Sequence, residues 1–263
     1  AFHAVITLPP VEEKELSHHV EAKVKKMLPR PIEEMQVVHQ KVPPRTPEEK
    51  DITLLVTAAP RRLVAFYTAI FQKAGLELDE LETEAFAIER SLVGKDTATV
   101  MVVDIGAERT NFFIIDSGLP ITHRSIQVGA LAFDAIIEKR LGIPKDLIAQ
   151  ARIDASRLDG AGVPIEPFLS AIEPMVKEIQ YNFDIFLHQS RNEGKRPEKI
   201  ILTGGLSLFP PIQEYLKQQF QMKVFVGDPW ARVVYQDGLR RVLDPIAPRM
   251  AVCIGLALRT IVK

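Results

Sequence analysis

The residues of this sequence that could do chemistry form two glycine turns, each directly after an apolar run. The first turn contains Asp104, Gly106 and Ala107 after the apolar residues 99–103, with Thr110 closing it. Gly106 permits a tight turn, so that the backbone amides of residues 107–110 can point at an anion. Asp104 places a carboxylate beside those amides. A magnesium nucleotide requires a group of amides that can bind a phosphate, with a carboxylate beside it for the cation.

The second turn is Thr203, Gly204 and Gly205, which follows a predicted strand at residues 199–202, apolar after Lys199, and precedes a predicted helix at 207–220. The first motif, Asp-x-Gly-x-x-x-Thr, is short, and an ordinary hairpin explains it equally well when it stands alone. The second turn favours the other interpretation, because both turns end a buried strand and lead into a new element. We therefore expect the two turns to approach each other as two walls of one cleft.

Composition narrows the class of protein. The 263 residues are 46% hydrophobic and 25% charged, with a net charge of −1, which indicates a globular chain large enough for two lobes. Nearly balanced charge argues against nucleic acid as a partner. The single cysteine, Cys253, excludes intrachain disulfides and fits a reducing compartment. No apolar run is long enough to span a bilayer and no signal peptide is evident, so we expect membrane association only through partners.

Hydrophobic periodicity predicts an α/β fold. We expect strands at residues 2–8, 35–42, 52–58, 76–81, 99–103, 112–115, 121–128, 199–202 and 223–226, and helices at 11–28, 61–74, 84–92, 129–141, 145–152, 164–191, 207–220 and 247–261. A loop is expected at 154–163, and Pro174 should kink or restart the long helix. The order strand, helix, strand, strand at the start predicts a small separate domain.

Several short motifs resemble the actin-like superfold, and within it the PilM family. They are Thr7-Leu8-Pro9-Pro10, Leu28-Pro29-Arg30-Pro31, Ala58-Ala59-Pro60-Arg61-Arg62, Gly75-Leu76-Glu77-Leu78, the two glycine turns and Arg124-Ser125-Ile126-Gln127-Val128-Gly129. The resemblance implies an α/β, actin-like (ribonuclease H-like) two-lobe fold. Residues 1–60 would be a strand-helix-strand-strand (SHS2) insert domain, 61–96 the remainder of lobe I, and 97–263 lobe II with a helical subdomain at about 143–195.

The same resemblance assigns roles to individual residues. Asp104, Gly106, Ala107 and Thr110 would form the second phosphate turn, with Asp104 holding Mg²⁺ through water. Thr203, Gly204 and Gly205 would form the adenosine turn, and Glu178 would face the ribose. Glu84 occupies the place of the glutamate that polarises water in hydrolysing relatives. A plain acidic residue at a helix N-terminus explains Glu84 equally well.

The chain also departs from the family pattern. The first phosphate hairpin is expected to be missing together with the N-terminal part of lobe I, because only Ala1 precedes the first strand. If that hairpin supplies about two charge-assisted hydrogen bonds, ATP binding weakens on the order of a hundredfold. Ala130 replaces the second glycine of a Gly-Gly pair, and Gln180 and Tyr181 replace basic residues. We therefore expect ATP and Mg²⁺ to bind weakly or not at all, with at most weak ATPase activity.

The function implied by the resemblance is a cytoplasmic, nucleotide-binding adaptor of the type IV pilus assembly platform, peripheral at the inner membrane. Its expected partners are an N-terminal segment of PilN and the motor ATPases PilB and PilT, with self-association as a further possibility. Three alternatives stay open: an FtsA-like cytoskeletal or division protein, a component like GspL of type II secretion, and an actin-fold kinase. The kinase is disfavoured because no substrate-binding acid is evident in the sequence.

Overall fold

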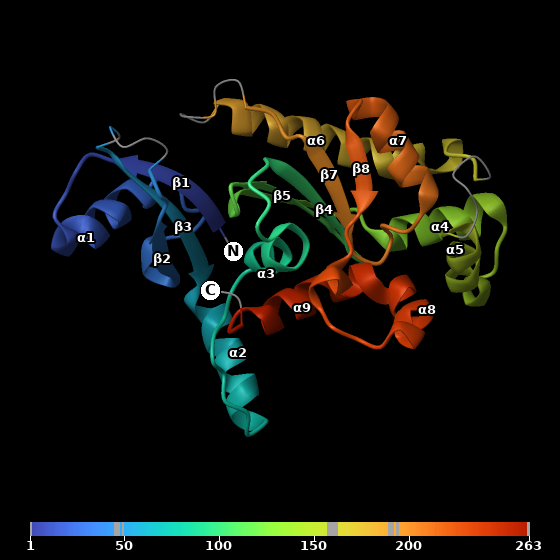
Figure 1. The fold of residues 1–263 in the computed structure, drawn as a ribbon, viewed down its shortest axis with the longest axis horizontal. Helices are drawn as coiled ribbons and strands as arrows, with labels where there is room; N and C mark the ends of the chain where they lie inside the picture. Colours follow the sequence, from blue (N-terminus) through green and yellow to red (C-terminus); the bar gives the residue numbers. More distant parts are fainter. Residues whose placement is uncertain are drawn as a thin grey trace. The chain divides into compact units, whose positions relative to one another are not determined.

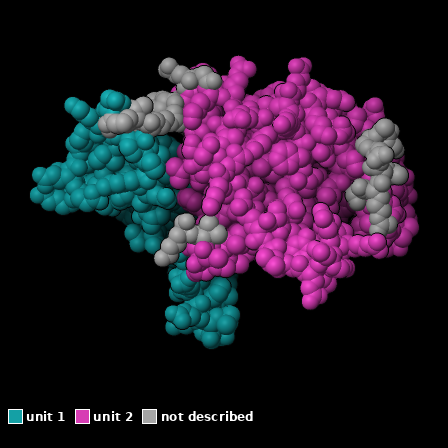
Figure 2. Space-filling view, in the orientation of Figure 1, with its two compact units in different colours: residues 1–83 teal, residues 84–263 magenta. Residues whose placement is uncertain are grey.

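The computed structural model describes residues 2–44, 48, 50–156, 163–188, 192 and 195–261 (Figure 1). The chain divides into two compact units, residues 1–83 and 84–263 (Figure 2). The lobe boundaries that the family resemblance implies stay a prediction, because compactness alone does not assign lobes.

The first unit is built on a three-stranded antiparallel sheet. Strands β1 (Phe2–Leu8), β2 (Met35–Lys41) and β3 (Ile52–Pro60) lie in the order β1-β3-β2. Helix α1 (Glu13–Val24) buries Leu16, Val20 and Val24 against one face of this sheet, because these residues recur on one side of the helix. A 3-10 turn (Ile32–Glu34) precedes β2. The predicted order strand, helix, strand, strand is therefore confirmed.

Helix α2 (Arg61–Lys73) follows β3 directly, and its predicted range is confirmed. The strand predicted at residues 76–81 is wrong, since this segment is irregular. An extended segment needs a neighbouring strand to pair its N–H and C=O groups. None of the described strands pairs with these residues.

The second unit contains a five-stranded mixed sheet in the order β6-β5-β4-β7-β8. The strands are β4 (Val100–Ile105), β5 (Thr110–Asp116), β6 (Leu119–Ile126), β7 (Lys199–Thr203) and β8 (Lys223–Val226). Strands β4, β5 and β6 form an antiparallel meander, whereas β7 runs parallel to β4 and β8 parallel to β7. The carboxyl ends of β4 and β7 therefore lie at the same edge of the sheet.

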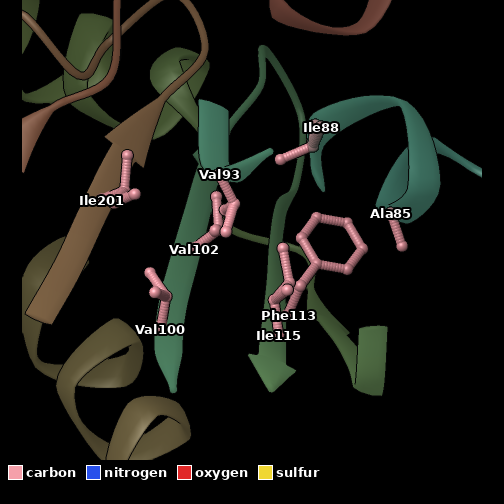
Figure 3. Packing of buried hydrophobic residues seen from close by; sticks show 8 residues of the cluster. All are labelled: Ala85, Ile88, Val93, Val100, Val102, Phe113, Ile115 and Ile201. Atoms are coloured by element: carbon pink, nitrogen blue, oxygen red, sulfur yellow. The ribbon is translucent and has the colours of Figure 1, made fainter. Parts of the chain in front are cut away.

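Helices cover both faces of this sheet, which explains why its strands are apolar without alternation. On one face, α3 (Glu84–Ile88) and the π-helical turn after it (Glu89–Val93) pack Ala85, Ile88 and Val93 against Val100, Val102, Phe113, Ile115 and Ile201 (Figure 3). On the other face, α6 (Leu169–His188) contacts β5 and β6. The remaining helices are α4 (Ala130–Leu141), α5 (Ile148–Ser156), α7 (Pro210–Phe220), α8 (Arg240–Leu243) and α9 (Ala251–Leu258).

Several helix predictions differ from the structure in detail. Helix α6 runs through Pro174 without restarting. Helix α5 continues to Ser156, so residues 154–156 of the predicted loop are helical, and residues 157–162 lie outside the described part. The predicted closing helix is two elements, because Pro248 interrupts it: a 3-10 segment (Asp244–Met250) precedes α9. Residues 189–191 of the predicted long helix also lie outside the described residues.

Candidate functional site

The two glycine turns lie directly against each other. In the parallel pair of β4 and β7, Asp104 aligns with Thr203, so that both turns leave the same edge of the sheet. Gly204 has a φ of +85°, and a Cβ atom on it would lie 2.4 Å from the carbonyl oxygen of Ile105. Only glycine fits a backbone that is both left-handed and this close. The expectation that the two turns approach each other is confirmed.

The first turn, Gly106 to Arg109, is held from behind by the start of α4. The amide of Gly106 donates to the carbonyl of Arg109 over 3.0 Å, and the amides of Ala130 and Leu131 donate to the carbonyls of Gly106 and Ala107 over 2.9 Å each. Ala107 to Arg109 are exposed, and their own amides have no acceptor among the described residues. The turn thus presents consecutive free amide donors, which is the arrangement of an anion-binding nest.

Two carboxylates and an amide meet beside this turn. The Nδ2 atom of Asn111 donates to Oε2 of Glu84 over 3.2 Å and to Oδ2 of Asp104 over a longer 3.5 Å. The pKa of Asp104 is raised to about 6, mainly by burial and also by the negative charge of Glu84, whereas the Asn111 hydrogen bond and the charge of Arg109 act in the opposite direction. Each carboxylate thus lies within electrostatic reach of the other.

The two predicted threonines of the site use their hydroxyls inside the protein. Thr110 donates its hydroxyl to the carbonyl of Val128 over 2.7 Å, and Thr203 donates to the carbonyl of Pro248 over 2.9 Å. The amide of Gly204 donates to the same Pro248 carbonyl. Both threonines are fully buried. Their side chains therefore fix the shape of the two turns, and both hydroxyl donors are used within the protein.

Gly205 is the exposed residue of the second turn. Its amide donates to no acceptor in the part of the chain that the structure describes. A Cβ atom on Gly205 would lie 3.3 Å from Nε of Arg249, so this arginine runs alongside the turn. The second turn therefore offers an open amide and a neighbouring guanidinium.

Glu84 is placed by the packing of α3 on α9. Gly255 in α9 approaches α3 so closely that a Cβ atom there would lie 1.8 Å from the carbonyl oxygen of Ala87. The side chain of Arg90 adds a hydrogen bond of 2.9 Å to the carbonyl of Gly255. Because Pro248, just before α9, accepts the bonds from Thr203 and Gly204, α9 connects the helix of Glu84 to the second turn.

Glu178 lies apart from this group. It projects from α6 toward β6, where it pairs with Arg124, whose guanidinium lies 4.6 Å above the Tyr181 ring. Arg124 aligns with Phe112 in the β5–β6 pair, and Phe112 alternates with the residues that face α3. Glu178 therefore approaches the sheet from the face opposite to Glu84. The structure brings together Glu84, Asp104, Gly106, Ala107, Gly204 and Gly205, but not Glu178.

The arrangement fits a hydrated cation with a nucleotide. The free amides suit phosphate oxygens, and Gly204 leaves no side chain between the turns. Within the described residues, no cluster of three or more histidine, cysteine, aspartate or glutamate side chains could bind a metal ion. Magnesium characteristically keeps several waters and takes only one or two carboxylates, so Asp104 and Glu84 match its needs.

Sequence reasoning missed Asn111 as a site residue. The signal was present, because a hairpin that pairs Ile105 with Thr110 must place Asn111 opposite Asp104. A polar residue that lies opposite a candidate carboxylate on a buried face is itself a candidate site residue. The role of Pro248 as acceptor for both residues of the second turn had no comparable sequence signal.

Comparison with known proteins gives a consistent result. A family model described as type IV pilus assembly protein PilM matches residues 3–261. A solved PilM-PilN type IV pilus biogenesis complex is similar with a TM-score of 0.78 and 22% identity, over 98% of this chain and 76% of that chain. Two structures of MreB5 from Spiroplasma citri, bound to AMPPNP and to ADP, give TM-scores of 0.53 and 0.57 at 17% and 16% identity, each over 77% of this chain and 66% of that chain. These likenesses confirm the predicted actin-like fold.

Proposed function

Because the chain belongs to the PilM family of type IV pilus assembly proteins, we propose that it is an adaptor whose partner binding responds to a bound nucleotide. The family places it in type IV pilus assembly. The nucleotide part of the proposal rests on one observation: the turns at Gly106 and Gly204 meet at Asp104 with open amide donors. The fold, shared with MreB5 structures that contain AMPPNP or ADP, supports it.

In this proposal the first turn binds phosphate oxygens through the amides of Ala107 to Arg109. Gly204 and Gly205 contact the adenosine part of the nucleotide, where the exposed amide of Gly205 lies beside Arg249. Asp104 would hold Mg²⁺ through water, and the cation would supply neutralisation of the phosphate charge. Thr110 and Thr203 contribute by holding the turns in shape.

Glu84 is the candidate for polarising water. Its Oε2 atom accepts from Asn111, while its Oε1 atom has no partner among the described residues. A free carboxylate oxygen near the phosphate turn can accept a proton from a water molecule. We propose weak hydrolysis at most, with nucleotide binding as the main property.

Glu178 is proposed to contact the ribose with the oxygen that the protein leaves open. Its Oε1 atom pairs with Arg124 and accepts a longer bond of 3.4 Å from Asn182, whereas Oε2 accepts no hydrogen bond from the described part of the chain. Reaching from the α6 face, Glu178 would bind a ribose that extends past the sheet edge. Glu178→Gln should then weaken the binding of adenosine nucleotides but leave the binding of tripolyphosphate unchanged.

The proposed partners follow from the family and from the solved PilM-PilN complex. We propose that this chain binds a short N-terminal segment of a PilN-type protein, and that it couples to motor ATPases of the PilB and PilT type. Self-association is a further proposal. No described helix is long and apolar enough to cross a membrane. From the proposed partners we also propose a cytoplasmic location at the inner membrane, reached through these partners.

Calorimetry with MgADP and MgATP tests the nucleotide proposal. We expect measurable binding that Asp104→Ala weakens at least tenfold and that Gly238→Ala leaves unchanged, since Gly238 has no neighbour within 4 Å of a Cβ atom. Equal affinities for the wild type and Asp104→Ala would contradict the assignment of Asp104. A turnover assay with Glu84→Ala separates hydrolysis from binding, because hydrolysis should fall by a larger factor than the affinity for MgADP.

Titration with a synthetic PilN N-terminal peptide tests the adaptor proposal. We expect binding whose affinity changes when MgATP is present, since an adaptor that responds to nucleotide must couple the two sites. The thermodynamic coupling is reciprocal, so the peptide should change nucleotide affinity by the same factor. Peptide binding that is identical with and without nucleotide would contradict the coupling, and no peptide binding would contradict the adaptor role.

A further inference from the structure

Asn111 occupies a position at which one side chain can orient both carboxylates. It stands opposite Asp104 in the antiparallel pair of β4 and β5, on the face that α3 covers. The residue is only 5% exposed, so bulk water does not compete for the hydrogen bonds of its amide. An amide nitrogen carries two hydrogens, and here one is directed to Glu84 and the other to Asp104.

The remaining oxygens of the two carboxylates stay available. Oδ1 of Asp104 faces the second turn, because a Cβ atom on Gly204 would lie 2.6 Å from it. Oε1 of Glu84 has no partner among the residues that the structure describes. The bridge therefore uses one oxygen of each acid and leaves the other oxygen for waters or a cation.

We propose that Asn111 is a positioning residue for the magnesium nucleotide, holding Glu84 and Asp104 toward one point between the two turns. This inference rests on the proposed nucleotide binding. The amide donors offset the repulsion of two neighbouring carboxylates when no cation is present, and they fix the carboxylate rotamers before Mg²⁺ arrives. Preorganised ligands bind a cation more tightly because fewer groups must be ordered on binding.

Asn111→Leu keeps the approximate shape and removes both donors. We expect its affinity for MgADP to fall about tenfold, the scale of a lost hydrogen bond to a charged group, while its affinity for ADP with EDTA changes less than twofold. A merely structural role would lower both affinities by the same factor. Equal losses with and without magnesium would therefore overturn the proposal.

Asn111→Asp gives a test that does not need the nucleotide. It places a third carboxylate where the amide now bridges the other two, so Mg²⁺ alone should raise the melting temperature of this variant by about 3 °C or more and that of the wild type by less. The matched control is Asn192→Asp, since Asn192 is also 5% exposed but bonds to the carbonyl of Phe186 on α6. That variant should show no added response to Mg²⁺.

The two kinds of failure are distinguishable. A wild type that binds no nucleotide would contradict the proposed function, whereas the response of Asn111→Asp to Mg²⁺ alone decides whether the three side chains converge. If Mg²⁺ stabilises Asn111→Asp no more than Asn192→Asp, the acids do not share a point and the inference is overturned.

Discussion

Gly204 and Asp104 are in direct contact across β4 and β7: a Cβ atom on Gly204 would lie only 2.6 Å from Oδ1 of Asp104. The second turn therefore forms one wall around the carboxylate of the first. A substitution at either residue must displace the other, so variants at this contact test the geometry of the site directly.

Gly204→Ala should destabilise the second unit strongly. The substitution forces alanine to adopt a φ of +85° and pushes its Cβ atom to 2.4 Å from the carbonyl oxygen of Ile105. Strain and overpacking together should lower the free energy of unfolding by about 2–5 kcal/mol, measured by urea denaturation. Gly142→Ala is the control, because Gly142 has a φ of +68° but no neighbour within 4 Å. It should cost about 1–2 kcal/mol, from strain alone. Equal losses for the two variants would contradict the close approach.

Asp104→Asn should stabilise the protein without ligand at pH 8. The folded-state pKa of Asp104 is about 6, raised from 3.8 mainly by burial. The folded state thus binds a proton more readily than the unfolded chain, so the free energy of unfolding rises as the pH falls from 6 toward 4. Above pH 6, burying the ionised Asp104 imposes its full penalty on the folded state. At pH 8 that penalty is about 1–3 kcal/mol, and the neutral asparagine should remove it.

The check is urea denaturation of Asp104→Asn and the wild type between pH 4 and 8. The difference in unfolding free energy between the two proteins should shrink as the pH falls. A difference that does not depend on pH would show that Asp104 titrates normally.

His123 should produce a pH dependence of the opposite sign. Burial is the main reason that its pKa falls from 6.5 to about 4, and its ring stacks on Phe113 with centroids 4.8 Å apart. As the pH falls below 6.5, the imidazole is protonated in the unfolded chain before it is protonated in the folded one. The contribution of neutral His123 to the free energy of unfolding is therefore complete above pH 6.5 and is lost toward pH 4. The full loss amounts to about 3 kcal/mol.

His123→Phe should keep the stacking and remove this acid-side loss, as measured by denaturation between pH 4 and 7. The windows of His123 and Asp104 overlap with opposite signs, so the wild type should show a flatter profile than either variant. A variant profile that still follows the wild type would contradict the assignment to His123.

Gly255→Ala should separate α3 from α9. The added methyl group would lie 1.8 Å from the carbonyl oxygen of Ala87, so one helix must move. We expect a loss of about 2–4 kcal/mol in unfolding free energy, together with weaker MgADP binding because Glu84 moves with α3. Leu256→Ala, at a neighbouring position that is 46% exposed, is the control and should cost less than about 1 kcal/mol. Normal MgADP affinity in a destabilised Gly255→Ala would contradict the connection to Glu84.

Local sequence signals were sufficient for most elements. The first strand, the helices that end at glycines and the two turns at Gly106 and Gly204 follow from apolar runs and residues with special backbone freedom. The strand predicted at residues 76–81 failed because a strand is defined by its partner, which local sequence does not contain. The closing helix was predicted too long because the pattern of apolar residues outweighed Pro248 in the prediction.

The sequence by itself determined that Asp104 and Gly204 end buried strands, since strand ends and turns depend on residues close together in the chain. Only the tertiary structure decided which side chains meet there. Asn111 reaches Asp104 through strand register, Glu84 arrives through the docking of α3 on α9, and Glu178 is directed to the other face by α6. Such meetings depend on the packing of segments far apart in sequence, and each requires the whole sheet and its helices to be in place.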